Sequence, residues 1–324
     1  MMYDQQEIVL GFDTSCYTTS CSAVSLDGKV IGNYRKLLPV PAGERGLRQS
    51  EAVFHHVRQL PRLVEQMGQD IRGKKIAGVC ASSRPRDEED SYMPVFQVGD
   101  AQARAIASVL GVPSFSSTHQ RGHIAAARID SGLTSKDFLT FHISGGTTEL
   151  LQMKDDVLTL VAHTGDLHAG QLVDRAGVAM GLPFPAGPNL EKLALRGHAK
   201  QRLGISVGRR DQSRGEICHF SGAETQILSW IRGGEPKEDV AAEIYDLLAR
   251  TFACMIDEAE RKSGTGDVLL CGGVSSSILL RSLLEERVKK LNKYVRLYFG
   301  HPEYSSDNAV GQAMIARQYV LKGF

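Results

Sequence analysis

The chain has 324 residues, of which 42% are hydrophobic and 23% are charged, a composition that suits one large or two ordinary globular domains. Its formal net charge is +1, which excludes a global field that attracts nucleic acid, so any RNA binding needs a local patch or a partner. The sequence shows neither a signal peptide nor an apolar run near the ~20 residues of a membrane span, and we expect a cytoplasmic protein without membrane contact.

The first forty residues predict three strands. An apolar run at 8–13 indicates a buried strand, and 20–25 and 29–35 indicate two more, joined by a hairpin turn at Asp27-Gly28. An acidic and hydroxyl-rich turn between such strands is typical of the actin-like ATPase and sugar-kinase superfamily, where it binds phosphate. An ordinary meander gives the same pattern. The candidate phosphate-turn residues are Asp13, Thr14 and Ser15.

Two helices and a charged loop follow in the chain. Apolar residues at helical spacing predict helices over 50–67 and 98–110, and a short strand is expected at 76–81. The segment 84–92 carries charges of both signs. Such a run is usually a solvated surface.

His119 and His123 lie four residues apart in a segment that ends in three alanines, and alanine favours helix. On a helix their imidazoles project from one face about one turn apart, so two ring nitrogens can reach one divalent metal. The same spacing also arises by chance or as a solvated pair, and a third ligand has to come from elsewhere. A zinc protease needs a glutamate after the first histidine as general base; Gln120 stands there and disfavours peptide hydrolysis.

The second half of the chain repeats the opening pattern. A strand over 138–144 leads into Ser144-Gly145-Gly146-Thr147, and 150–153 and 157–162 predict a hairpin across Asp155-Asp156. This internal duplication predicts two related halves. Two adjacent glycines allow the backbone to approach a phosphate or carboxylate closely.

The rest of the sequence predicts helices over 169–180, 240–261, 278–291 and 309–321. A Gly-Gly turn after the strand 268–271 offers the N–H groups of the next helix to an anion. Asp307 stands before the last helix, where an N-cap residue would be. A basic cluster, Arg209, Arg210 and Arg214, either contacts a phosphate backbone or lies in a solvated loop.

Several motifs follow one another in a specific order from the first half of the chain to its last helix. They are His119-x-x-Gly122-His123, Ser144-Gly145-Gly146, Asp174 followed by Gly181-Leu182-Pro183, Phe220-Ser221-Gly222, Gly272-Gly273-Val274 and Asp307-Asn308-Ala309. Together they resemble the tRNA N6-adenosine threonylcarbamoyltransferase family (TsaD), formerly labelled a sialoglycoprotein endopeptidase. The resemblance implies an α/β, two-lobed actin-like ATPase or sugar-kinase fold, with duplicated halves around a central cleft. The first lobe would span 1–132, completed by 303–324, and the second 133–302.

The resemblance also implies an activity and a site. The activity is metal-dependent transfer of a threonylcarbamoyl group from threonylcarbamoyl-adenylate to the adenosine next to the tRNA anticodon. His119, His123 and Asp307 would hold one iron or zinc ion and leave positions open for substrate. The positions implied for an adenylate-containing substrate or ATP are Ile143, Ser144, Gly145, Gly146, Thr147, Asp174, Gly187 and Ser277. The implied partners are tRNA and either a smaller paralogous subunit of the same fold or a second copy of the chain.

Several polar positions depart from the family pattern, and no side chain is assigned as the catalytic base. Tyr17 and Thr18 stand where acidic residues are usual, Thr147 replaces His or Asn, Ser277 replaces Asn, and Glu224 falls near a usual Lys. The charged run 84–92 replaces a Gly-Pro-Gly loop. Losing one acid or base typically costs about 10²–10⁴ in rate. An alternative therefore stays open: a divergent nucleotide- and metal-binding paralogue that acts as a regulatory or partner subunit without turnover.

Overall fold

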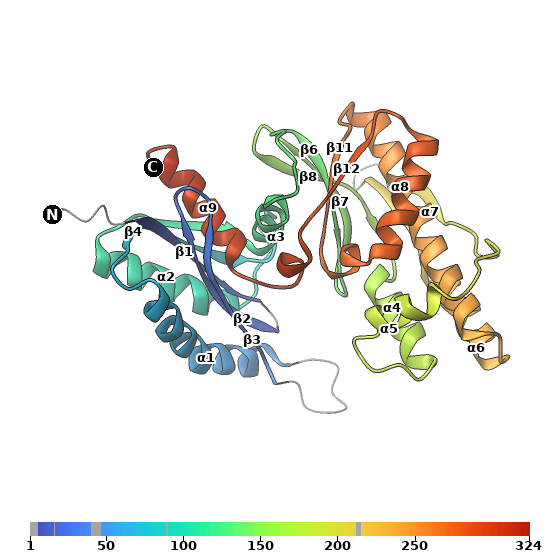
Figure 1. The fold of residues 1–324 in the computed structure, drawn as a ribbon, viewed down its shortest axis with the longest axis horizontal. Coiled ribbons are helices and arrows are strands. Elements are labelled where there is room, and N and C mark those ends of the chain that lie inside the picture. The colour runs from blue at the N-terminus through green and yellow to red at the C-terminus, as the bar shows by residue number, and fades with distance from the viewer. Residues whose placement is uncertain (1–5, 16, 40–46, 89, 212–214) are drawn as a thin grey trace. The chain divides into compact units, whose positions relative to one another are not determined.

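The computed structural model describes residues 6–15, 17–39, 47–88, 90–211 and 215–324, and it divides into two compact units (Figure 1). Unit 1 comprises 1–129 together with 306–324, and unit 2 comprises 130–305. The division predicted from the sequence was 1–132 with 303–324, and 133–302. Among the described residues, no helix combines the length and the apolar character that crossing a membrane requires.

Unit 1 is built on a five-stranded sheet in the order β3-β2-β1-β4-β5. The first three strands form an antiparallel meander, and β4 and β5 run parallel to β1. The strands are β1 (Glu7–Thr14), β2 (Thr18–Ser25), β3 (Val30–Leu37), β4 (Lys75–Arg84) and β5 (Ser114–Thr118). The helices are α1 (Gln49–Asp70), α2 (Phe96–Leu110), α3 (His119–Arg128) and α9 (Val310–Leu321).

The two faces of β1 carry different neighbours because side chains alternate along a strand. Leu10 and Phe12 belong to the core that includes Leu60 of α1 and Ala103 of α2. Gly11 points the other way, and a Cβ at this position would collide with the backbone of Ala309 and Ala313 at the start of α9. Glycine therefore lets α9 lie directly on the strand, and Asp13, two residues further on, shares this face.

A second close approach joins α3 to α9. A Cβ on Gly122 would lie 2.6 Å from Gln312 Nε2, and one on Gly311 would overlap the backbone of Gly122. The Gln312 side chain in turn donates to the Thr118 carbonyl at the start of α3 (2.9 Å). The glycine of the His-x-x-Gly-His motif thus has a packing role: it lets the helix with the two histidines cross the helix that follows Asp307.

Unit 2 is built on a seven-stranded sheet in the order β12-β11-β6-β7-β8-β10-β9. The strands are β6 (Phe138–Ile143), β7 (Thr148–Lys154), β8 (Val157–Thr164), β9 (Val207–Asp211), β10 (Gly215–Cys218), β11 (Asp267–Cys271) and β12 (Arg296–Phe299). The α-helices are α4 (Ala169–Ala179), α5 (Gly187–Ala194), α6 (Ser221–Arg232), α7 (Lys237–Ser263) and α8 (Ile278–Leu291), and short 3-10 helices lie at Gly273–Ser276 and Pro302–Tyr304.

The expected duplication is present in the strand orders. The series β8-β7-β6-β11-β12 in unit 2 repeats the order and directions of β3-β2-β1-β4-β5 in unit 1, with an antiparallel meander followed by two parallel strands. The turn between β7 and β8 has positive φ at both Asp155 (51°) and Asp156 (64°), as a tight hairpin of the I′ type requires. The additions β9, β10 and α6 extend unit 2 beyond this shared strand pattern and were not expected from the sequence.

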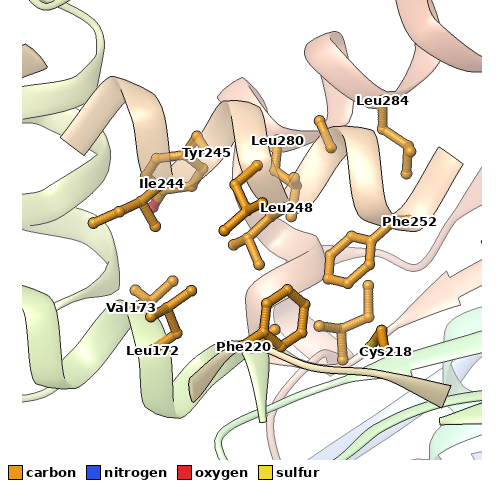
Figure 2. Packing of buried hydrophobic residues seen from close by; sticks show 14 of the residues in the cluster. Leu172, Val173, Cys218, Phe220, Ile244, Tyr245, Leu248, Phe252, Leu280 and Leu284 are labelled. Carbon is orange, nitrogen blue, oxygen red and sulfur yellow. The ribbon is translucent and has the colours of Figure 1, made fainter. Parts of the chain in front are cut away.

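The core of unit 2 surrounds α7, and α8 packs against this helix (Figure 2). Phe252 of α7 contacts the rings of Phe141 from β6 and Phe220, with centroids 4.8 and 6.4 Å apart. Leu280 and Leu284 of α8 close the cluster from the other side. Burial of this length of α7 fixes the strand ends and the loops that carry the glycine-rich turns. Arg214 and the side chains of Arg209 and Arg210 lie outside the described residues.

Candidate metal centre and nucleotide pocket

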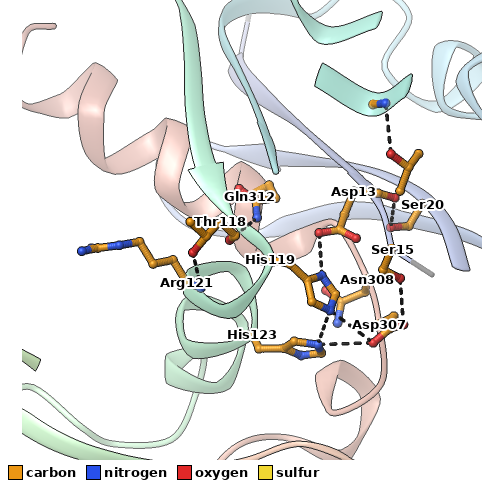
Figure 3. A network of polar contacts seen from close by, with 12 residues as sticks. Asp13, Ser15, Ser20, Thr118, His119, Arg121, His123, Asp307, Asn308 and Gln312 are labelled. Atoms are coloured by element: carbon orange, nitrogen blue, oxygen red, sulfur yellow. Dashed lines mark hydrogen bonds and ion pairs between the residues drawn. The ribbon is translucent and has the colours of Figure 1, made fainter. Parts of the chain in front are cut away.

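Two histidines and one carboxylate converge in unit 1 (Figure 3). One ligand-type atom from each of His119, His123 and Asp307 lies within 4.8 Å of the other two. The two Nε2 atoms are 3.1 Å apart, and Asp307 Oδ1 lies 3.3 Å from that of His123 and 3.6 Å from that of His119. Residues that are nearly 200 positions apart in the sequence therefore form one cluster.

Local structure explains why the cluster forms. Thr118 is the N-cap of α3, because its side chain accepts a hydrogen bond from Arg121 N (3.2 Å). The two histidines follow on the first turns of that helix. Asp307 is not the helix cap that its position suggested: α9 begins at Val310, and Asn308 Oδ1 accepts the Val310 N–H (3.0 Å). The capping interpretation of Asp307 is therefore wrong, and its carboxylate faces the histidines instead.

The donor set fits a tetrahedral divalent cation. Zn–N distances of about 2.0–2.1 Å place two ligand atoms about 3.3 Å apart around a tetrahedral ion, close to the three separations seen here. His119 Nδ1 lies 2.8 Å from Asp13 Oδ2 and donates to it, so the neutral ring carries its lone pair on Nε2, which faces the cluster. Two imidazoles and one carboxylate suit zinc or iron, with further positions left for other ligands.

The charges of the cluster are strongly coupled. Burial alone would lower the pKa of His119, but the charge and hydrogen bond of Asp13, and then the charge of Asp307, raise it to about 9. Burial alone would raise the pKa of the Asp307 carboxyl, but the hydrogen bond from His123, the charges of both histidines and the Ser15 hydroxyl hold it well below its ordinary value. The raised pKa keeps a proton on His119 at neutral pH, and a metal ion bound at Nε2 would have to displace it.

Asp13 and Thr14 at the end of β1, and Ser15 just after it, make side-chain contacts within unit 1. Asp13, Thr14 and Ser15 are 1%, 0% and 3% exposed. Thr14 Oγ1 donates to the Val95 carbonyl (2.8 Å) and accepts from Gly99 N (3.0 Å) at α2. Ser15 Oγ donates to Asp307 Oδ2 (2.8 Å), while Asp13 binds His119. The three phosphate-turn candidates thus surround the metal ligands and the start of α2.

The charged loop 84–92 is more than a solvated surface. Asp87 accepts from Arg121 Nε at both carboxylate oxygens (3.0 and 2.8 Å) and from the Thr118 hydroxyl (3.0 Å). The Pro85 carbonyl accepts the Gln120 N–H (3.0 Å). These contacts fasten the first turn of α3, on which the histidines lie.

Unit 2 contains a pocket of about 290 Å³ at its glycine-rich turns. Four residues expected at the substrate site line it: Gly145, Asp174, Gly187 and Ser277. Ser144, Gly146 and Thr147 belong to the adjoining turn, which is closed by Ser144 N–H donating to the Thr147 carbonyl (2.8 Å). The side chain of Ile143 is buried in the core rather than in the pocket wall.

Asp174 shapes the pocket from α4. Its Oδ1 accepts the Ala186 N–H (2.8 Å), which fixes the loop that leads into α5. Burial raises the pKa of this carboxyl, against hydrogen bonds from the Ala186 and Gly187 N–H groups. Gly170 is required beside it, because a Cβ there would lie 2.7 Å from Gly145 Cα.

Glu191 and Tyr245 are among the pocket residues that were not expected from the sequence. Glu191 of α5 accepts the Leu279 N–H at the start of α8 (2.7 Å), and Tyr245 of α7 donates its hydroxyl to the Gly187 carbonyl (3.2 Å). Ser277 is the N-cap of α8 and accepts from Leu280 N (3.1 Å). Protein groups therefore already bind two of the N–H groups that the sequence assigned to an external anion. For Glu191, the sequence offered one weak signal, a glutamate shortly after the segment Gly187-Pro188-Asn189.

Two more departures from the family pattern lie near the start of β2 and on α6. Tyr17 is 44% exposed, while the buried Thr18 lies in β2. Glu224 of α6 forms an ion pair with Arg175 of α4 (3.2 Å), next to Asp174 in the sequence. The glutamate at this position thus binds a cation of its own unit.

Comparison with known proteins gives a consistent result. The family model for tRNA N6-adenosine threonylcarbamoyltransferase matches residues 42–316. Proteins with that name from Chlorobium luteolum and Methanopyrus kandleri are each 30% identical over 97% of this chain, which covers 93% and 87% of their lengths. A probable bifunctional tRNA threonylcarbamoyladenosine biosynthesis protein from Thermoplasma volcanium is 28% identical over 97% of the chain, and the chain spans only 56% of that relative.

Solved structures show the same fold at low identity. HypF of T. kodakarensis matches 100% of this chain with a TM-score of 0.65 and 17% identity, over 49% of its own length. Component A of the Acidaminococcus fermentans (R)-2-hydroxyglutaryl-CoA dehydratase matches 97% of this chain and 99% of its own, with a TM-score of 0.57 and 16% identity. A ROK family glucokinase from Streptomyces griseus matches with a TM-score of 0.55. The fold is therefore the actin-like ATPase and sugar-kinase fold that the sequence predicts.

Proposed function

Because this chain belongs to the tRNA N6-adenosine threonylcarbamoyltransferase family, whose members are transferases, we propose that it transfers a threonylcarbamoyl group from threonylcarbamoyl-adenylate to the adenosine next to the tRNA anticodon. The observation that carries the proposal is the convergence of His119, His123 and Asp307 at metal-ligand distances. Two imidazoles and one carboxylate are a donor set that suits zinc or iron, which supports a metal-dependent reaction.

The reaction is an acyl transfer. The exocyclic N6 amine of the adenosine attacks the carbamoyl carbon of the donor, the bond from that carbon to the phosphate oxygen breaks, AMP leaves, and the amine loses one proton. A zinc or iron ion held by the triad would act as a Lewis acid that polarises the carbonyl and stabilises negative charge on oxygen. His119, His123 and Asp307 would hold that ion in place, and Gln120 cannot serve as the base of a peptidase.

The pocket in unit 2 suits the nucleoside part of the donor. Among the described residues that line it, none is lysine or arginine, whereas Asp174 and Glu191 present carboxylate oxygens. Carboxylates accept hydrogen bonds from ribose hydroxyls and from an adenine amine, but they repel phosphate. Tyr245 and the glycine-rich turns supply flat and apolar surface for a base.

The decisive experiment is a turnover assay. The purified chain is incubated with threonylcarbamoyl-adenylate, tRNA that lacks the modification and Zn²⁺ or Fe²⁺, and the tRNA nucleosides are separated and weighed by mass spectrometry. We expect modified adenosine from the wild type and at least 100-fold less from His123→Ala. The absence of product where an established family member yields it would overturn the proposal, and adenylate binding without turnover would identify a regulatory paralogue instead.

The partner is a separate part of the proposal. Relatives that carry the name bifunctional are nearly twice as long as the matched segment, since the chain spans 56% of the Thermoplasma volcanium protein. We therefore propose that this chain acts with a second protein, either a smaller paralogous subunit or another copy of itself. Light scattering on the purified chain, alone and in the assay mixture, distinguishes a monomer from these assemblies.

A further inference from the structure

Asp13 near the end of β1 and Ser15 just after it each contact one of the three proposed metal ligands, at an atom that faces away from the ion position. Asp13 Oδ2 accepts from His119 Nδ1 (2.8 Å), so the opposite ring nitrogen, Nε2, is the one that faces His123. Ser15 Oγ donates to Asp307 Oδ2 (2.8 Å), so the other oxygen, Oδ1, faces both histidines. Figure 3 shows the two contacts on either side of the cluster.

We propose that Asp13 and Ser15 are positioning residues of the metal centre: Asp13 fixes the ring orientation and tautomer of His119, and Ser15 fixes which oxygen Asp307 presents. This inference rests on the metal site of the proposed function. Neither residue touches the ion or the reacting atoms. Mutation of residues that hydrogen-bond to metal ligands in this way typically changes metal affinity 10–100-fold.

The burial of Asp13 argues against a purely structural role. Its side chain is 1% exposed, and its second oxygen, Oδ1, lacks a hydrogen-bond partner among the residues that the structure describes. Leaving a buried acceptor unsatisfied costs about 1–3 kcal/mol, and an apolar residue at this place on the strand would avoid that cost. The carboxylate is therefore explained by what it does for the imidazole of His119.

Contacts with α1 and β2 also hold the backbone of Asp13 and Ser15 in place. His56 of α1 is fully buried, and its Nε2–H donates to the Ser15 carbonyl (2.8 Å), while its Nδ1 lies 2.8 Å from Thr19 Oγ1. The Asp13 carbonyl accepts from Ser20 Oγ (3.0 Å). Because these contacts exist without metal, the ligands are preorganised, and little ordering is left for the binding step.

The experiment measures Zn²⁺ affinity of the full chain by competition with a chromophoric chelator. We expect Asp13→Asn and Ser15→Ala each to weaken Zn²⁺ binding about 10–100-fold, while the far-UV circular dichroism of the apo proteins stays like that of the wild type. The Co²⁺-loaded variants should show altered visible absorption, which reports coordination geometry. The matched control is Ser20→Ala: it removes an equally buried hydroxyl, which bonds the Asp13 backbone and does not touch a ligand.

Three results would overturn the inference. Zn²⁺ affinities of Asp13→Asn and Ser15→Ala within twofold of the wild type would show that neither residue acts on the ligands. Equal losses in Ser20→Ala would show that the turn merely loosens. If His123→Ala binds Zn²⁺ as the wild type does, the metal site itself fails, which is a separate failure from the first two. If Asp13→Asn does not fold, the Zn²⁺ affinity of Ser15→Ala still tests the inference.

Discussion

The contact between Asp87 and Arg121 should hold the first turn of α3 in place. Asp87→Ala removes a carboxylate that binds Arg121 through two nitrogens (Nε at 2.8 Å, NH2 at 2.7 Å) and also accepts the Thr118 hydroxyl. The side chains of Asp87 and Arg121 are only 28% and 24% exposed. A fully exposed ion pair contributes about 0.2–1 kcal/mol, and a hydrogen bond to a charged group about 1.5–3 kcal/mol. We therefore expect a coupling free energy of about 1–2 kcal/mol.

Hydrogen exchange of the α3 amides, followed by mass spectrometry, measures this coupling locally. A double-mutant cycle with Asp87→Ala, Arg121→Ala and both together isolates the pair from the other contacts of either residue. Glu88→Ala is the matched control, because it removes the same charge from an exposed neighbour in the loop. A coupling below about 0.5 kcal/mol, or an equal effect of Glu88→Ala, would show that the loop is only a solvated surface.

Two further predictions concern buried groups. Burial lowers the pKa of His56 to about 4, whereas an unfolded histidine titrates near its ordinary value of about 6.5, so the unfolded chain binds the extra proton first. This contribution to the free energy of unfolding is complete above about pH 6.5 and is lost towards pH 4 by up to about 1.4 kcal/mol per pH unit. Urea titrations of the wild type and His56→Gln at a series of pH values should therefore differ in their pH dependence within that window. The same pH dependence of stability in both proteins would refute the assignment. Glu191→Ala should lower the free energy of unfolding by about 1.5–3 kcal/mol, because it strips the carboxylate from the Leu279 N–H; calorimetry that finds less than 0.5 kcal/mol would contradict this role.

Much of the fold could be predicted because its signals are local. Apolar alternation and the Asp27-Gly28 and Asp155-Asp156 turns are sufficient to place both three-stranded meanders, and their repetition reveals the duplication. Helix α8 was expected over the residues that it occupies, since its apolar spacing is regular. By contrast, β9 and β10 lie in a charged stretch without alternation, and their pairing with β8 depends on the sheet edge that unit 2 provides.

The site shows the same division between local and distant causes. The helical spacing of His119 and His123 is readable in the sequence, whereas the approach of Asp307 depends on where α9 crosses α3, at Gly122 and Gly311. The preference of aspartate for helix starts made Asp307 look like an N-cap. In the structure Asn308 accepts the hydrogen bond from the Val310 N–H, and the Asp307 carboxylate lies close to His123. Glu191 and Tyr245 were missed for a similar reason: only tertiary packing brings them to the pocket.

The proposed transferase activity depends most directly on one divalent ion bound by His119, His123 and Asp307. Anomalous diffraction at the zinc edge, from crystals of the Zn²⁺-loaded chain, locates that ion without reference to activity. We predict a single strong peak at about 2.0–2.1 Å from Nε2 of both histidines and about 2.0–2.2 Å from an Asp307 oxygen. A peak elsewhere, or none at this cluster under conditions where the chain binds Zn²⁺ in solution, would contradict metal binding by His119, His123 and Asp307.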